Sequence, residues 1–390
     1  MTSSTAGVLD EAYQRLHATG PEFDGWLSNH GPMVAEAMAR RGQADDVQRW
    51  LDFYVRRLEE FPRGTGPIGT RWREALGDPR RVADWTAYFR QEVASQPWQE
   101  VLNTWWPRLL PGLVAAATHG VIRTGHAVAA LLTDGESPDH LAELAHGLAY
   151  WAARWQPLPG AETEPQPAGD TELSPGGDTE PRRGADTEPR PGAGHQAGHQ
   201  AGLTAARALA AVPRIADQSG GIRERLPRLA GLPGWQTALA AVPAAIPAAP
   251  DLTRAWLAEL ADEATVRYLE YGHGNAIMLV HSATAPTAVL RTLPALRQDL
   301  WAPSTAAAWT AAAALTAIYA PAVAAPAAVL PEAPRGPRAA EEVFARAVDH
   351  GDEHVIKFAD TAADVHARTG RPAALAAAIR AADLVPRKTA

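Results

Sequence analysis

A lysine near the C-terminus is the residue whose type most clearly suggests chemistry. Only two of the 36 basic residues are lysines, Lys357 and Lys388, and the rest are arginines. Lys388 lies among the last three residues, where chain ends commonly fray. Lys357 lies between Ile356 and Phe358, three residues after His354. Arginine keeps its proton in a protein, whereas a desolvated lysine amine can lose its charge and become a nucleophile, a base or the precursor of a ligand. The position therefore indicates a need for an amine.

The spacing of His354 and Lys357 in "HVIK" places both on one face of a helix. A charged ammonium does not bind a metal, but a neutral amine can add CO2 and form a carbamate, which supplies an anionic oxygen ligand. The alternatives are a Schiff-base lysine, a general base and a structural lysine whose amine reaches the surface. His350 is only a reserve ligand, because Gly351 and Asp352 indicate that the helix restarts at Asp352.

Three other motifs hold histidines in distinctive settings. His30 follows Asn29, a predicted helix N-cap. His119 and His126 are seven residues apart on one predicted helix, about 10.5 Å along its axis. The geometry is easier if one of the two is a metal ligand and the other contacts the substrate or supports a ligand than if both bind one ion. His281 lies in an apolar stretch. Each one alone is more often a hydrogen-bonded core histidine than a ligand.

The remaining histidines of the predicted helices have plainer settings. His17, His140 and His366 lie among polar residues, which predicts a solvated helix face. His146 lies four residues before Tyr150, and we expect it to pack against its neighbours.

Composition excludes several classes of function. The 46% hydrophobic content is sufficient for a large core. The formal charge of -8, without any basic block, argues against a nucleic-acid partner. The chain has no cysteine, so that any metal must be held by His, Asp, Glu or a modified residue. No apolar run reaches the ~18 residues of a membrane span and no signal peptide is evident, which predicts a cytoplasmic protein without membrane contact.

The domain organisation follows from one change of composition. Residues 160–202 repeat a DTEP-like unit and then GHQA, which predicts a disordered low-complexity insertion. Residues 1–159 and 203–390 are predicted to form the N-terminal and C-terminal parts of one helical core. The fold class is all-α, a multi-helix bundle of roughly 14–18 helices in a single large domain. A helical repeat scaffold is the structural alternative.

Apolar residues at spacings of three and four carry this helical prediction. Ser137 and Asp251 are predicted N-caps, and Gly272 and Gly370 are predicted helix ends. The amphipathic segments are 44–61, 78–95, 137–155, 251–272 and 338–370.

Five motifs in order, "SNHGPM", "HGVIRTGHAV", "LAYWAARWQPLPG", "VHSATAPTAVLR" and "GDEHVIKFAD", resemble the questin oxidase-like family. The resemblance implies an enzyme that opens rings of aromatic polyketides such as anthraquinones. Members of the family are described either as Baeyer-Villiger-type oxidases assisted by a reduced nicotinamide or, in one fungal branch, as non-haem iron dioxygenases. In that branch four histidines and a carboxylated lysine hold the iron.

The resemblance implies a ligand set for Fe(II) in this chain. The metal ligands would be His30, His126, His281, His354 and carboxylated Lys357, with His119 as the substitute if one of the histidines is wrong. O2 would be the co-substrate, and the other substrate a small aromatic molecule.

His119 and Arg123 are the predicted catalytic residues, because they could polarise a quinone or phenol oxygen or take a phenolic proton. An ion pair between helices is the alternative for Arg123. Trp105, Trp106 and Trp151, together with Trp155, either line a flat pocket or pack in the core.

Two other functions stay open at this point. One is a metal-independent, NADPH-assisted Baeyer-Villiger-type oxidase, in which the histidines act as acids and bases. The other is a non-catalytic helical binding scaffold, in which the histidines are core hydrogen-bonding groups.

Overall fold

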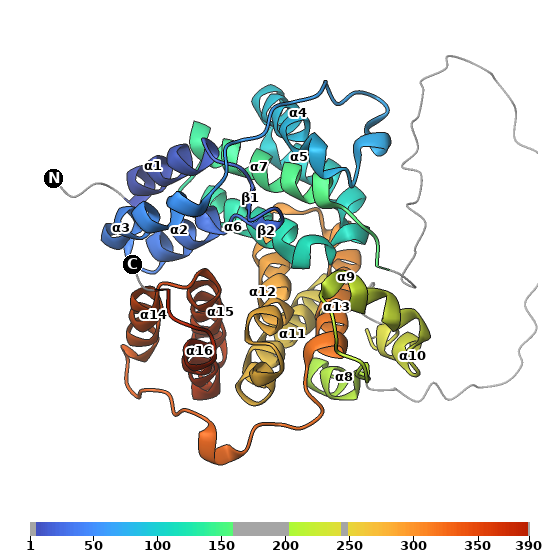
Figure 1. The fold of residues 1–390 in the computed structure, drawn as a ribbon, viewed down its shortest axis with the longest axis vertical. Coiled ribbons are helices and arrows are strands. Elements are labelled where there is room, and N and C mark those ends of the chain that lie inside the picture. The colour runs from blue at the N-terminus through green and yellow to red at the C-terminus, as the bar shows by residue number, and fades with distance from the viewer. Residues whose placement is uncertain (1–4, 159–202, 243–248, 389–390) are drawn as a thin grey trace, which may run out of the picture.

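The computed structural model describes residues 5–158, 203–242 and 249–388. In these ranges the chain forms sixteen α-helices, several short 3-10 turns and one two-stranded sheet (Figure 1). The predicted all-α class, the single helical domain and the number of helices are confirmed. The predicted disordered insertion at 160–202 lies outside the described residues.

The α-helices are α1 (Thr5–His17), α2 (Gly31–Arg40), α3 (Ala44–Tyr54), α4 (Val82–Ser95), α5 (Trp98–Leu109), α6 (His119–Thr133), α7 (Pro138–Arg154), α8 (Ala205–Ala211), α9 (Ile222–Arg225), α10 (Trp235–Leu239), α11 (Pro250–Tyr271), α12 (Ala276–Thr292), α13 (Trp301–Tyr319), α14 (Ala339–His350), α15 (Glu353–Thr369) and α16 (Pro372–Leu384). Strands β1 (Glu22–Phe23) and β2 (Leu27–Ser28) pair antiparallel. The sequence did not predict this hairpin, because strands of two residues are too short to show alternation.

Helix boundaries follow the local capping signals in most places. The Ser137 hydroxyl accepts a hydrogen bond from the amide of His140 at the start of α7. Gly370, in a left-handed conformation, ends α15. The prediction of Asp251 as an N-cap is wrong, because α11 already begins at Pro250, whose missing amide hydrogen suits a first helical turn.

The segment 338–370 forms two helices, as the predicted restart at Asp352 requires. Gly351 takes a φ of +83° and ends α14, a conformation that favours glycine. The Asp352 carboxylate then accepts hydrogen bonds from the amides of His354 and Val355 and caps α15. The N-cap of α15 is therefore local, and it fixes His354 in the first turn of the helix.

Four helices that are distant in sequence form a closed ring. Helix α2 packs against α6 and α15, and α12 packs against the same two helices. In Figure 1 α14 and α16 lie beside α15, while α4, α5 and α7 lie on the side of α6. The ring brings residues from both sides of the 160–202 segment into one interior.

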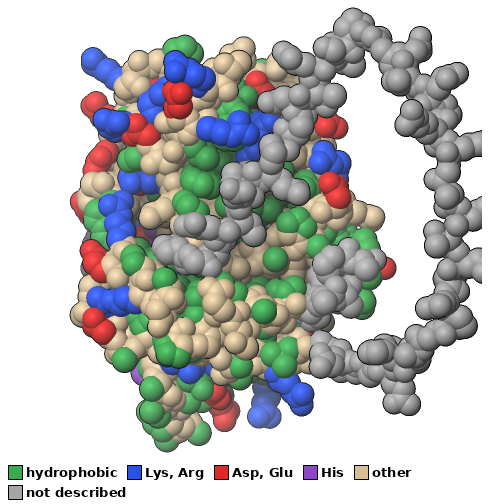
Figure 2. Space-filling view, turned by 90° about the vertical axis from the view of Figure 1, so that its right-hand side faces the viewer, with side chains coloured by type: hydrophobic (Ala, Val, Ile, Leu, Met, Phe, Trp, Pro, Cys, Tyr) green, Lys and Arg blue, Asp and Glu red, His purple; other side chains and the backbone are tan. Residues whose placement is uncertain are grey.

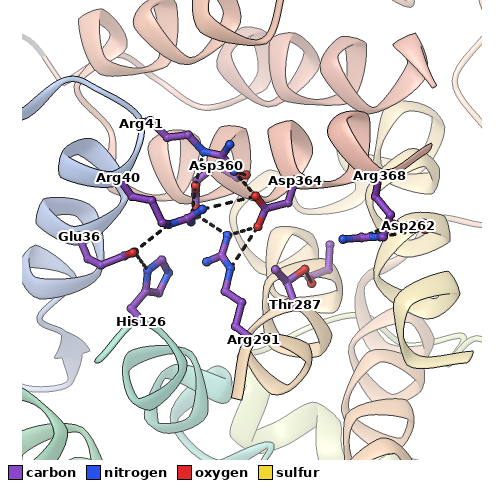
Figure 3. Close-up of polar contacts among 11 residues, drawn as sticks. Glu36, Arg40, Arg41, His126, Asp262, Thr287, Arg291, Asp360, Asp364 and Arg368 are labelled. Carbon is purple, nitrogen blue, oxygen red and sulfur yellow. Dashed lines mark hydrogen bonds and ion pairs between the residues drawn. The ribbon is translucent and has the colours of Figure 1, made fainter. Parts of the chain in front are cut away.

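A buried ionic network joins the ring helices to one another (Figure 3). Asp360 of α15 is fully buried and accepts hydrogen bonds from Arg40 at 2.6 and 2.7 Å, from Arg41 at 2.8 Å and from Arg291 of α12 at 2.7 Å. Arg40 also donates to Glu36 of α2 at 2.8 Å. Burial acts to raise the pKa of Asp360, but the three guanidinium groups outweigh it and hold the pKa well below its usual range.

The large aromatic residues pack in the core. Trp105 lies edge-on to Trp85 at 5.3 Å between ring centroids, and Trp106 lies edge-on to Trp151 at 5.2 Å. All four rings are buried. Packing, and not the lining of an open pocket, is therefore what these tryptophans do.

The surface turned to the viewer in Figure 2 mixes both signs of charge along its edges, and almost no histidine shows on it. Within the described ranges, none of the helices combines the length and the apolar character that crossing a membrane requires.

We expect the Arg291→Met variant to lower the free energy of unfolding by about 3–5 kcal/mol, because it leaves the buried Asp360 and its neighbour Asp364 short of a cation. The matched control is Arg338→Met, whose ion pair with Glu341 is mostly exposed and should cost at most about 1 kcal/mol. Urea unfolding measures both variants. Equal losses would show that the network does not bear on stability.

Candidate metal centre

Four buried imidazole rings meet inside the helical ring. The Nε2 atom of His119 lies 2.7 Å from Nε2 of His30 and 3.1 Å from Nε2 of His281. The ring centroid of His354 is 4.6 Å from that of His30 and 5.4 Å from that of His281. His30, His119 and His354 also offer ligand atoms within 4.8 Å of one another.

The four ring helices each supply one of these side chains near their N-terminal ends. His30 is the N-cap of α2, His119 is the first residue of α6, and His354 is the second residue of α15. His281 lies in the second turn of α12. The ionic network lies farther along the same helices, so that all four run from the histidines toward the network.

Hydrogen bonds set which nitrogen of two rings carries the proton. The Nδ1 atom of His119 lies 2.6 Å from the carbonyl oxygen of Ala116, and Nδ1 of His281 lies 3.0 Å from that of Ile277. A carbonyl can only accept, so each Nδ1 is the donor and each neutral ring presents the lone pair of its Nε2. Two lone pairs 3.1 Å apart repel one another unless a cation lies between them.

The nitrogen separations fit such a cation. Metal–nitrogen bonds of about 2.0–2.1 Å, the zinc values, place two ligands at a right angle about 3 Å apart. The observed 2.7 and 3.1 Å are close to this value. The residues present therefore fit a transition metal with several imidazole ligands.

A strained turn supports the orientation of His119. Ala116, Ala117 and Thr118 have φ values of 47°, 52° and 67°, a left-handed run without glycine. Left-handed backbone costs roughly 1–2 kcal/mol per non-glycine residue. The turn brings the Ala116 carbonyl to Nδ1 of His119, and strain of this kind clusters at functional sites.

The centre favours uncharged histidine rings. Burial lowers the pKa of His30 and His119 well below the ordinary value, and the nearby Lys357 amine is the next cause. Burial, followed by the neighbouring His119 and Lys357, does the same for His281. Lys357 therefore acts on three of the four rings, and it lies three residues after the fourth, His354, on α15.

Lys357 is almost completely buried, with 1% of its surface exposed. Its Nζ atom has no hydrogen-bond partner among the described residues. Burial lowers the pKa of Lys357 to about 7, although Glu353 and Asp352 act to raise it. The amine does not reach the surface, so the alternative of a structural lysine with a solvated head is wrong.

The structure places His126 apart from the four rings. Its Nδ1 atom lies 2.5 Å from Glu36, within the ionic network of Figure 3. His119, the substitute in the predicted ligand set, is the residue of α6 that lies between His30 and His281. Two histidines seven residues apart share a helix face, and only the packing of α2 and α12 decides which of them enters the cluster.

Arg123 forms the ion pair that was the alternative to a catalytic role. Its Nε and a terminal nitrogen donate to the two oxygens of Glu143 on α7, at 2.6 and 2.7 Å, and both side chains are buried. Glu143 also lies 2.8 Å from Nε2 of His17 on α1. Arg123 therefore ties α6 to α7 and α1.

Two of the histidines predicted to be solvated are not. His140 has 1% of its surface exposed, and its Nδ1 donates to the carbonyl of Gly135. His17 bonds to Glu143 and stacks on His146 with ring centroids 4.2 Å apart. The prediction that His146 packs agrees with this contact. Polar neighbours in sequence misled the prediction for His17 and His140, because those neighbours lie on other faces of the helices.

The sequence-based prediction missed two carboxylates beside the centre and the cation that pairs with them. Asp352 and Glu353 directly precede His354 and are buried. Lys388, which was expected in a frayed end, forms ion pairs with both. The adjacent acids in "DEH" were the only available signal.

The fold and this cluster define a class, a helical protein of one domain whose interior holds four converging histidines and a buried lysine that has no hydrogen-bond partner among the described residues. The sequence profile of the family described as questin oxidase-like matches residues 30–362, a range that includes all five of these residues. The chain belongs to this family. No curated protein matches the chain. Membership implies an oxidoreductase and suggests an oxidase that acts on aromatic polyketides.

The pKa of Lys357 makes stability depend on pH. The folded protein releases the Lys357 proton near pH 7, whereas the unfolded chain keeps it up to about pH 10.5. Between these values the unfolded state binds more protons, so the free energy of unfolding rises with pH, by at most about 1.4 kcal/mol per unit. We expect urea unfolding of metal-free protein in CO2-free buffer to show this rise, and the Lys357→Met variant to lack it. The same slope in both proteins would contradict a buried, neutral amine.

Proposed function

We propose that the protein is an O2-dependent oxidoreductase that oxygenates or cleaves a carbon–carbon bond of an aromatic polyketide or quinone-like molecule at a non-haem iron. The proposed ligands are His30, His119, His281, His354 and carboxylated Lys357. The observation that carries the proposal is the convergence of the imidazole nitrogens at 2.7 and 3.1 Å, in a member of this family, beside a buried amine that no described residue hydrogen-bonds.

The carboxylation of Lys357 follows from its surroundings. A neutral amine is a nucleophile, and burial holds the pKa of Lys357 at about 7, so that a large fraction is neutral at physiological pH. Its Nζ forms a bond to the carbon of CO2, and one carbon–oxygen π bond breaks as its electron pair moves to the oxygen. The nitrogen then releases one proton to solvent, which leaves a carbamate. The product is an oxygen ligand with one negative charge, which balances part of the charge of a divalent ion.

Each group of this chain then has a defined task. The carbonyls of Ala116 and Ile277 hold His119 and His281 in the tautomer that presents Nε2. The surrounding helices keep water from the centre, because all five ligand residues are buried. Bound iron would supply the one-electron chemistry with O2 that organic side chains do not perform. His119 becomes a ligand in this proposal, and Arg123 stabilises the packing of α6.

Metal analysis of protein purified without oxygen tests the carbamate. We expect about one iron per chain in the wild type, and a loss of most of it in both Lys357→Ala and Lys357→Arg, because arginine cannot take up CO2. Iron that persists in both variants would refute the role of the carbamate. A wild type without tightly bound metal would refute the iron centre. Turnover that survives chelation and requires NADPH would instead support the Baeyer-Villiger alternative.

A second comparison separates the two histidines of α6. We expect His119→Ala to lose at least tenfold in iron affinity, whereas His126→Ala should keep its iron and lose stability, because it leaves Glu36 without one of its partners. Iron titration followed by urea unfolding measures both effects. Loss of iron in His126→Ala with retention in His119→Ala would reverse the assignment.

A further inference from the structure

Lys388, the second lysine of the chain, pairs with two acids that precede His354. Nζ of Lys388 lies 2.6 Å from Glu353 and 3.0 Å from Asp352. Both carboxylates are buried, with 2% of each side chain exposed, whereas the Lys388 side chain is 41% exposed. Glu353 and Asp352 directly precede His354, and Lys357 lies one helical turn further on. The chain therefore places its second lysine immediately outside the proposed metal centre.

The C-terminal segment 385–388 is held against the turn between α14 and α15. The Nε2 atom of His350 lies 3.0 Å from the carbonyl oxygen of Val385, and Arg387 forms an ion pair with Asp349 at 2.6 Å. A Cβ at Gly351 would lie 3.1 Å from the backbone oxygen of Lys388. Figure 1 shows the C-terminus beside α14, α15 and α3. Lys388 thus reaches the two carboxylates from a docked segment.

The same carboxylates face two histidines of the centre. Nδ1 of His354 lies 3.4 Å from Asp352, and Nδ1 of His30 lies 3.8 Å from Glu353. Both Nδ1 atoms are buried and have no hydrogen-bond partner among the residues that the structure describes. Both separations are longer than those of ordinary N–H···O hydrogen bonds.

The four histidines therefore have two kinds of partner. His119 and His281 donate from Nδ1 to backbone carbonyls, which the helices fix in place. His30 and His354 face the carboxylates of Glu353 and Asp352, of which Asp352 is also held by the amides at the start of α15. Two buried carboxylates side by side need a cation to be buried at low cost. Histidines that bind a metal commonly donate their other ring N–H to a carboxylate or a carbonyl, and this contact fixes the tautomer and the orientation of the ring.

We infer that Glu353 and Asp352 are positioning residues for the rings of His30 and His354, and that Lys388 is the cation that holds both carboxylates in place. The inference rests on the proposed metal centre. Arg57 also binds Glu353, at 2.9 Å, whereas Lys388 bridges the two carboxylates. Lys388 lies beyond residues 30–362, the range that matches the family, so the pairing of Lys388 with the two carboxylates depends on the C-terminal segment of this chain.

The test compares two lysine variants with a neighbouring control in the full chain. Cobalt(II) serves as the probe metal, and its loss to an excess of chelator is followed through its visible absorption. We expect Lys388→Met to lose cobalt about tenfold faster than the wild type and to shift the absorption band, since outer partners of this kind contribute about 10–100-fold to metal affinity. Lys388→Arg, which keeps the charge, should restore most of the retention.

The control is Arg387→Met, which removes an exposed ion pair from the same segment and should change the rate of loss less than twofold. Glu353→Gln, as a second variant, should resemble Lys388→Met, because an amide leaves His30 without a charged partner. Lys388→Met that behaves like Arg387→Met, with an unchanged band, would overturn the inference while the metal centre stands. A wild type that binds no cobalt would overturn both.

Discussion

The buried carboxylate of Asp360 is the group on which the rest of the structure depends. Arg40 and Arg41 from the end of α2, and Arg291 from the end of α12, all donate to it. A buried charge of this kind is tolerated only when its partners remain in place, so the network fixes the ends of α2 and α12 against the middle of α15. Lys357 lies one turn before Asp360 on the same helix, about 4.5 Å along the axis. The register that satisfies Asp360 therefore also sets where Lys357 and the histidines meet.

The centre itself concentrates unfavourable features that a metal would relieve. Two imidazoles direct lone pairs at each other, a buried amine lacks a hydrogen-bond partner within the described part of the chain, and a left-handed turn supports His119. Each feature costs free energy in the folded protein, and the charge-balanced network a few turns away supplies the rigidity that maintains them. The fold thus keeps these side chains buried and close together, which is the arrangement that the proposed metal centre requires.

The fold was largely predictable because its signals are local. Apolar spacing, the Ser137 cap and the glycine that ends α15 each act within a few residues, and the break at Gly351 followed from the same rules. The exceptions have physical reasons. The hairpin strands are too short for a periodic pattern. His140 is buried although its sequence neighbours are polar, because burial depends on the face that a neighbouring helix covers.

The sequence by itself determined the chemistry that is available: an amine at Lys357 where arginine would otherwise stand, no thiols, and histidines at the starts of predicted helices. Tertiary structure decided which of these groups meet. Spacing along α6 cannot distinguish His119 from His126, since both lie on one face of the helix. The packing of α2 and α12 against that face places His119 among the histidines and His126 in the ionic network. The pairing of Lys388 with the acids next to His354 depends likewise on the docking of the C-terminal segment, a contact between residues more than thirty positions apart that no local rule encodes.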